Sequence, residues 1–357
     1  MPAQRKIDDA EAGREVTLKL FNMTLTILPG ISHLTSLQEL DVSHNNLRTL
    51  PTLPAGLQIL HAYNNCLQNL PSLPAGLRRL YVSNNGLRTL PTLPSGLKML
   101  YAHRNYLQTL PDLPSGLQEL YVARNNLRVL PTLPSELQLL NASRNCLQTL
   151  PTLPSDLQIL HASHNNLRSL PALPSELQTL HVHRNCLQTL PSISHLTSLQ
   201  VLTVFDNTLQ ALPELPSGLQ SLTVFDNKLQ TLPVLPKTLN ILYASNTMLQ
   251  FLPSLPAGLE TLDVSRNNIN TLPDLSHLTK LYGIGIDDSS ITHSHVNNIN
   301  RPLLRDKLIF DQRDIDAFNT AVSLFTNKNT YFSLLPRDVT GIIKEYISYI
   351  SVMVYDD

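Results

Sequence analysis

Residues 117–135 read LQELYVARNNLRVLPTLPS, and near-copies of this stretch follow one another along most of the chain. We number the places of each copy from its first leucine, so Leu117 has place 1. The stretch has a fixed frame, whose members are Leu117, Leu120, Val122, Asn125, Leu127, Leu130, Pro131, Leu133 and Pro134. The frame returns every 20 residues, a period that is typical of a solenoid of stacked units. The places that vary between copies are where a function would have to lie.

The repeats begin at residues 15, 37, 57, 77, 97, 117, 137, 157, 177, 199, 219, 239 and 259, and a degenerate turn follows at 281. Ten copies have 20 residues and three have 22, and the longer copies end in SHLTS or SHLTK. A linear array of this kind is one domain however many copies it has. We therefore expect a solenoid over residues 15–300. Residues 1–14 form a polar leader, which is either a short frayed helix or without fixed structure.

Each copy predicts a short strand and a short return to the next strand. In the 20-residue copies, two prolines three residues apart, such as Pro131 and Pro134, favour an extended, polyproline-like return. The longer returns have room for one helical turn. The predicted fold class is an α/β solenoid, a leucine-rich-repeat coil of short parallel strands with mostly extended convex returns.

An asparagine at place 9, such as Asn125, recurs along the array. The chain turns inward there and leaves backbone groups without ladder partners, and a buried amide can both donate to and accept from them. Thr247 takes this place in one copy. The sequence therefore predicts an asparagine ladder that is interrupted near Thr247, and a coil that is weaker there.

The composition changes from Leu303 onward. Apolar residues have helical spacing over residues 311–325 and again over 335–350. The open end of a parallel coil needs a cover for its last strand and its apolar core. We expect residues 301–357 to form a small helical C-terminal cap or tail.

Composition excludes several classes of protein. Lys and Arg number 26 against 27 for Asp and Glu, a balance that argues against nucleic acid as the partner. Cys66, Cys146 and Cys186 lie four and two repeats apart, about 20 and 10 Å at a strand spacing of about 4.8 Å, which is too far for a disulfide. The polar N-terminus lacks the apolar core of a Sec signal peptide. No run approaches about 18 apolar residues, so we expect no membrane span.

The frame LxxLxVxxNxLxxLPxLPxx, which covers residues 37–280 almost without gaps, resembles the short leucine-rich repeats of bacterial secreted effectors of the YopM and IpaH/SspH groups. This resemblance implies delivery by a bacterial type III or type IV secretion system into the host cell cytoplasm, and a repeat domain that docks a host protein. Some members carry a ubiquitin-ligase domain with a catalytic cysteine. No cysteine follows Cys186, so we do not expect that domain here.

Places 3, 5, 7 and 8 are expected to point to the concave side, because side chains alternate along a strand. In the central copies these places hold tyrosine, histidine, arginine and phenylalanine, which are common anchors of protein interfaces. The candidate partner-binding residues are Tyr63, Tyr81, Tyr101, His103, Arg104, Tyr121, Arg124, Arg144, His161, His181, His183, Arg184, Phe205 and Phe225. Glu119 is the only carboxylate in these columns of the central copies. The inner face is thus expected to be basic in its middle and acidic toward its ends, and its partner to have an acidic patch.

Other interpretations of these columns have less support. They could be ordinary solvated strand residues, since tyrosine and threonine favour sheets. His161, His181 and His183 could converge on zinc, but no cysteine or carboxylate stands beside them. Tyrosine with arginine suits stacking on single-stranded nucleic acid, although the inner columns of the central copies have no lysine.

No glycine-rich phosphate loop, HExxH or GxSxG occurs in the sequence. We assign no catalytic, metal-binding or cofactor-binding residue and expect no small-molecule substrate. The function indicated is a non-enzymatic module that binds a host protein on its concave face. The alternative is an adaptor that recruits host ubiquitin machinery through residues 335–350, where LPRDVTGIIKEYI faintly resembles the start of an F-box.

Overall fold

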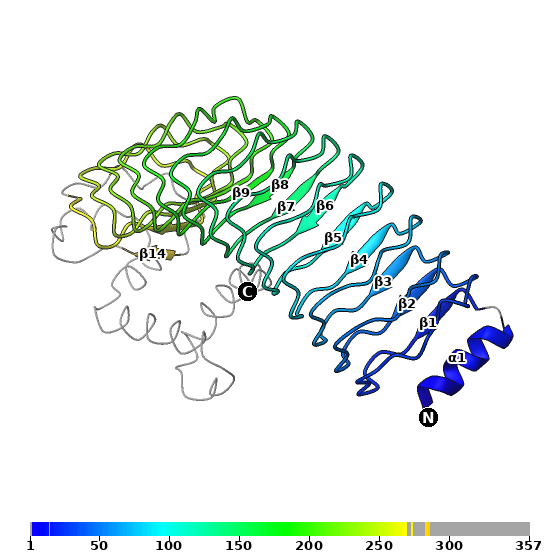
Figure 1. The fold of residues 1–357 in the computed structure, drawn as a ribbon. Helices are drawn as coiled ribbons and strands as arrows, with labels where there is room; N and C mark the ends of the chain where they lie inside the picture. The colour runs from blue at the N-terminus through cyan, green and yellow to red at the C-terminus, as the bar shows by residue number, and fades with distance from the viewer. Residues whose placement is uncertain (1, 14, 270–272, 274–282, 286–357) are drawn as a thin grey trace, which may run out of the picture. The chain divides into compact units, whose positions relative to one another are not determined.

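The computed structural model describes residues 2–13, 15–269, 273 and 283–285. These residues contain one helix, α1 (Pro2–Gly13), and a single sheet of 14 parallel strands in sequence order, which lie side by side in Figure 1. The strands are β1 (Thr17–Lys19), β2 (Glu39–Asp41), β3 (Ile59–His61), β4 (Arg79–Tyr81), β5 (Met99–Tyr101), β6 (Glu119–Tyr121), β7 (Leu139–Asn141), β8 (Ile159–His161), β9 (Thr179–His181), β10 (Val201–Thr203), β11 (Ser221–Thr223), β12 (Ile241–Tyr243), β13 (Thr261–Asp263) and β14 (Gly283–Gly285). The predicted solenoid of parallel strands is confirmed.

The chain divides into two compact units, Met1–Arg301 and Pro302–Asp357. The helices predicted at 311–325 and 335–350, and the C-terminal cap that they would form, lie outside the described residues. The cap and the recruitment of ubiquitin machinery therefore stay predictions. Within the described residues, no helix is both long and apolar enough to cross a membrane.

Each of the strands β1 to β13 occupies places 3 to 5 of a repeat. Neighbouring strands pair without a shift, so the place-4 leucines, such as Leu40 and Leu60, stand opposite each other and are buried. Because side chains alternate along a strand, places 3 and 5 point away from this leucine core. The side chains at places 3, 5 and 7 form a second surface of the coil. We call this surface the strand face.

The returns between the strands are of two kinds. In the 20-residue copies they are extended and close with one tight turn, in which Leu57 N–H donates to Pro54 O at 3.2 Å. The longer returns have room for a helical turn, and the two that are described do not form one. Leu34 N–H donates to Ile31 O and Leu37 N–H to Leu34 O, both at 3.0 Å, so the chain makes two successive turns instead.

The predicted asparagine ladder is present. The amide of Asn125 donates to Ala102 O of the preceding repeat and to Val122 O of its own, both at 3.0 Å. Its Oδ1 accepts from Leu107 N–H at 2.9 Å. Each such asparagine therefore fastens its repeat to the one before.

Thr247 interrupts this ladder as expected. Its hydroxyl has two acceptors within reach for its one proton, Ala244 O of its own repeat at 3.1 Å and Asn267 Oδ1 of the next one at 2.6 Å. Thr247 makes no bond to the preceding repeat like the one that Asn227 makes to Val204 O at 3.1 Å. The place-9 side-chain bond between the two repeats is therefore lost at this junction, although the Asn246 amide still donates to Asp226 Oδ1 of the preceding repeat at 2.6 Å.

The N-terminal segment forms a helix that packs against the first strand. Ile7 and Ala10 of α1 are almost fully buried, and Lys6 Nζ donates to Lys19 O of β1 at 3.0 Å. Of the two expectations for residues 1–14, the helix is the one that the structure shows. The apolar side of α1 shields the first repeat, which has no repeat before it to do so.

Candidate protein-binding surface

Aromatic rings form continuous columns on the strand face. At place 5, the ring centroids of His61 and Tyr81 are 4.7 Å apart, those of Tyr81 and Tyr101 5.0 Å, and those of Tyr101 and Tyr121 4.2 Å. His161 repeats the arrangement with His181 at 4.4 Å. The register of the strands causes the stacking, because residues at equal places in adjacent repeats stand about 4.8 Å apart.

A second column of rings lies at place 7. Phe205 stacks on His183 and on Phe225, in each case with centroids 4.2 Å apart. The guanidinium of Arg184 lies 5.9 Å from the centre of the Phe205 ring, within the range of a cation–π contact. The rings of His183, Phe205 and Phe225 thus lie together on the strand face.

Stacking decides what the strand face can offer to a partner. Where rings stack, as Tyr101 on Tyr121 and Phe205 on Phe225, each ring covers a face of its neighbour and leaves its edge outward. Tyr81 and Tyr101 are instead tilted by 48° to each other. His181 and Phe205, which were expected to be open, retain only 7% exposure each. Bases of a single-stranded nucleic acid need open ring faces on which to stack. This arrangement therefore favours contacts to ring edges and hydroxyls, as in protein interfaces.

Tyr101 and Glu119 form the polar centre of the tyrosine column. The Tyr101 hydroxyl donates to Glu119 Oε2, so the carboxylate is used within the column. Burial, and then this hydrogen bond, raise the pKa of Tyr101 well above its usual range. Burial also raises the pKa of Tyr81. Both phenols therefore stay protonated at neutral pH.

Two histidines at place 7 are held by serines one repeat earlier. Ser83 Oγ lies 2.8 Å from His103 Nδ1, and Ser163 Oγ lies 2.9 Å from His183 Nδ1. Burial, and then the charges of Arg104 and Arg124, lower the pKa of His103 to about 4. His103 is thus neutral at physiological pH and adds no positive charge to the face.

Place 8 has a backbone conformation that the alternation argument missed. All of its residues from His44 to Arg266 have positive φ; for example, φ is 56° at Arg104 and 55° at Arg124. The chain ends its strand here and turns, so these side chains lie at the margin of the strand face and not in its middle. Asparagine, aspartate and histidine enter this left-handed region most readily. Their frequency at place 8 was the signal that could have revealed the turn.

The structure does not support the histidines as ligands of a zinc ion. The planes of His161 and His181 are within 7° of parallel, so the rings face each other and do not aim their nitrogens at a common point. In the part of the chain that is described, no three metal-ligating side chains come together. Cys66, Cys146 and Cys186 are free, exposed thiols at place 10.

Comparison with known proteins agrees with this fold. The leucine-rich-repeat family model matches residues 36–57 and 258–281. No curated protein sequence matches the chain. Among solved structures, YopM from Yersinia enterocolitica WA-314 is 37% identical with a TM-score of 0.70, and the match covers 80% of this chain and 67% of that one.

Two further structures are similar over most of their length. YopM from Yersinia pestis, described as a leucine-rich effector protein, is 32% identical with a TM-score of 0.67, and the match covers 80% of this chain and 93% of that one. A leucine-rich-repeat protein from Leptospira interrogans is 27% identical with a TM-score of 0.66, over 82% and 83% of the two chains.

The fold and the strand face thus define a leucine-rich-repeat solenoid, a class of protein that commonly binds other proteins. The chain belongs to the leucine-rich-repeat family that includes YopM of Yersinia.

Proposed function

We propose that this chain is a non-enzymatic binding module that docks a host protein on its strand face. We further propose that it acts as a bacterial effector, delivered by a type III or type IV secretion system into the host cell cytoplasm. Its similarity to YopM supports the second proposal.

The observation that carries the docking proposal is the column of Tyr81, Tyr101 and Tyr121 beside the arginines of place 8, in which Tyr101 and Tyr121 stack and Tyr81 lies tilted against Tyr101. The three rings are only partly buried, although they fix one another in place. Arg104 is exposed at the margin of the same face. Rigid aromatic groups lose little conformational entropy on binding, and arginine pairs with carboxylates in two-pronged hydrogen bonds. A partner with an acidic patch suits this combination.

The test replaces the three tyrosines together with threonine, Tyr81→Thr, Tyr101→Thr and Tyr121→Thr. Threonine is preferable to alanine because the stacked rings contribute to stability, and because threonine already occupies place 5 at Thr203 and Thr223.

Proteins captured from host lysate by the wild type and the variant are compared by quantitative mass spectrometry, and the affinity of each candidate is then measured with purified protein. We expect the specific partner to be lost from the variant. Val234→Thr, at an exposed apolar residue on a return and away from the strand face, is the control and should capture as the wild type does. If the triple variant retains the partner, the strand face is not the docking surface.

A further inference from the structure

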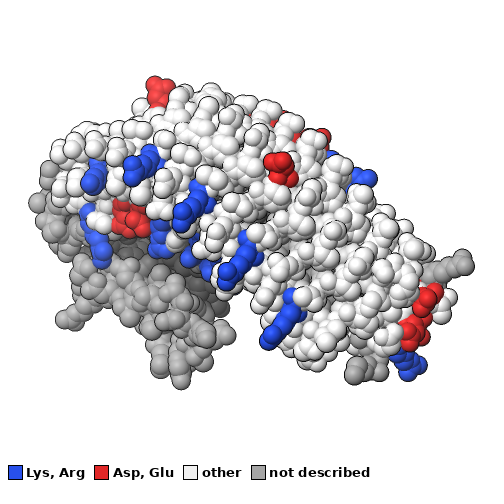
Figure 2. Space-filling model, viewed as in Figure 1, with Lys and Arg blue, Asp and Glu red and all other residues white. Residues whose placement is uncertain are grey.

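Along the eight copies that begin at residues 37 to 177, one lateral edge of the coil carries many arginines and no acid; the next copy places Asp206 on this edge, 3.4 Å from Arg184. The segments that follow each strand, places 8 to 13 of the copies that begin at residues 37 to 177, form this edge, which we call the arginine edge. It contains eight arginines and no Asp, Glu or Lys. The eight are Arg48, Arg88, Arg104, Arg124, Arg128, Arg144, Arg168 and Arg184. Figure 2 shows the row of basic side chains across the molecule.

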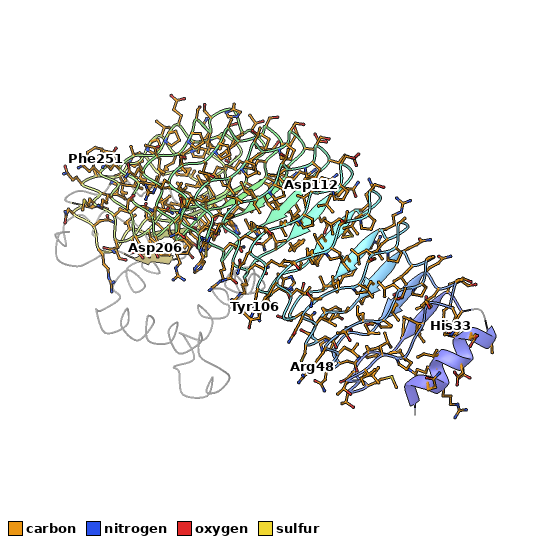
Figure 3. All side chains as sticks on the ribbon, in the orientation of Figure 1. His33, Arg48, Tyr106, Asp112, Asp206 and Phe251 are labelled. Atoms are coloured by element: carbon orange, nitrogen blue, oxygen red, sulfur yellow. The ribbon has the colours of Figure 1, made fainter. Side chains whose placement is uncertain are left out.

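The acidic side chains of the same copies lie elsewhere. Asp112, Glu136, Asp156 and Glu176 are on the returns. In Figure 3, Arg48 and Tyr106 lie along one margin of the coil and Asp112 lies on the opposite margin. A nearly neutral chain is therefore polarised across its width.

Half of the arginines form a regular row at place 12. Arg48, Arg88, Arg128 and Arg168 alternate with glutamines along the edge, and all four are exposed. Within the described residues, none of the four side chains takes part in an ion pair or a hydrogen bond. Backbone bonds hold adjacent copies together at this edge too; Cys66 N–H, for example, donates to Leu47 O at 2.9 Å. The ladder spacing of about 4.8 Å thus applies here, and successive arginines of the row stand about 9.6 Å apart.

Arginines at place 8 add charge at some conformational cost. Arg104, Arg124 and Arg144 have φ between 53° and 56°, where the asparagines of other copies fit with less strain. The backbone therefore does not explain the choice of arginine at these positions. The edge uses arginine and no lysine, which indicates a role in binding carboxylates. The planar guanidinium binds a carboxylate with two hydrogen bonds, and the ammonium group of lysine does not.

We propose that the arginine edge binds an acidic segment of a partner protein in the polyproline II conformation, with Asp or Glu at every third residue. This helix has three residues per turn and rises about 3.1 Å per residue, so every third side chain lies on one side, about 9.3 Å apart. That spacing matches the row at place 12. A β-strand does not match, because residues three apart point to opposite sides.

The test uses a fluorescent peptide of four Glu-Pro-Pro triplets and measures its binding to the full chain by anisotropy. The variant Arg48→Gln, Arg88→Gln, Arg128→Gln and Arg168→Gln introduces the residue that the intervening copies already carry at place 12, so we expect it to fold. Loss of four exposed arginine–glutamate pairs should weaken peptide binding about 30-fold, which corresponds to about 0.5 kcal/mol for each pair. The affinity of the wild type for the peptide should also fall as salt is added.

A rescue variant keeps these four glutamines and adds Gln68→Arg, Gln108→Arg, Gln148→Arg and Gln188→Arg. This moves the row by one repeat with its spacing and charge unchanged, so peptide binding should return. A peptide of the same composition with its four glutamates adjacent should bind more weakly than the triplet peptide.

Three results would overturn the proposal: unchanged binding by the quadruple glutamine variant, no recovery in the rescue variant, or equal affinity for the two peptides. Tighter binding of an oligothymidylate, dependent on the same arginines, would show instead that the edge takes nucleic acid. The proposal does not depend on the strand face. The triple tyrosine variant should bind the triplet peptide as the wild type does, so the two proposals can fail separately.

Discussion

The hydroxyl of Tyr101 donates a hydrogen bond to the carboxylate of Glu119, one repeat further along the sheet. The acceptor holds the proton on the phenol, and burial acts in the same direction. The column of tyrosines thus contains a partly buried phenol–carboxylate pair.

Glu119→Gln should lower the pKa of Tyr101. The amide is a weaker acceptor and carries no charge, so it favours the protonated phenol less, while burial still keeps this pKa above its ordinary value. The near-ultraviolet absorbance of tyrosinate, followed through an alkaline titration, measures the change. Glu136→Gln on a return, where the carboxylate pairs with Lys98, should leave the titration as it is. Identical curves for the wild type and Glu119→Gln would contradict the bond.

His103 should make the fold sensitive to acid. Its pKa in the folded state is lowered to about 4, below the ordinary value of about 6.5, so the unfolded chain binds the proton more strongly in between. Stability should therefore be lost as the pH falls from about 6.5 to about 4, by roughly 1–3 kcal/mol from this group.

His103→Ser, which installs the usual place-7 residue, should flatten the pH dependence of the denaturation midpoint in this range. Ser83→Ala removes the hydroxyl partner but leaves the burial and the arginines that lower the pKa. This control should keep the acid sensitivity. An equal slope in the wild type and His103→Ser would exclude His103 as the cause.

Thr247→Asn should restore the interrupted ladder. The amide can donate to the preceding repeat and accept from Leu229 N–H, as Asn227 does from Leu209 N–H at 3.0 Å. We expect a gain of about 1–2 kcal/mol, measured as a higher midpoint in urea. The neighbouring Met248 is exposed at place 10, where other copies have asparagine, so Met248→Asn should change little. A gain shared by both variants would mean that the ladder is not its source.

Glycine is required where a repeat follows a longer return. A Cβ on Gly218 would lie 2.2 Å from the carbonyl oxygen of Thr197, and one on Gly56 2.6 Å from that of Thr35. Gly218→Ala and Gly56→Ala should therefore destabilise the coil by about 1–3 kcal/mol, since backbone must move.

Gly76, which follows a 20-residue copy, is the matched control. A Cβ there would come no closer than 3.8 Å to any neighbour, so Gly76→Ala should be neutral or stabilising by up to about 1 kcal/mol. Thermal unfolding of the three variants measures the difference. Similar losses of stability in all three variants would show that a longer return does not require glycine in the repeat that follows it.

The repeating frame was enough to predict the coil, because each frame residue has one role wherever it occurs. Leu120 faces the core, Asn125 joins its repeat to the one before, and Pro131 and Pro134 keep the return extended. The longer returns were harder to predict. SHLTS has the length of a helical turn, but the turns that end at Leu34 and Leu37 satisfy the backbone in another way.

The sequence predicted which residues lie on the candidate surface, but not how their side chains are arranged there. Tyr101 and Tyr121 lie on the strand face as expected, yet ring stacking hides the faces that a list of residues implies are open. Arg104 was placed on the strand, whereas its positive φ puts it on the turn beyond. Alternation along a strand holds only while the strand lasts, and these strands have three residues.

The alternation of arginine and glutamine at place 12 extends to other places of the same copies. Val42, Ala62, Val82, Ala102, Val122 and Ala142 alternate in the buried core with the same rhythm. Over residues 37–156 the sequence therefore has a larger period of 40 residues, with one place-12 arginine in each 40-residue segment, and the place-6 alternation ends at Ala162. Unequal crossing-over between such segments would add or delete one guanidinium at a time and preserve the interval between them. Related chains of different length would then differ in how long an acidic segment they accommodate, and not in its pattern.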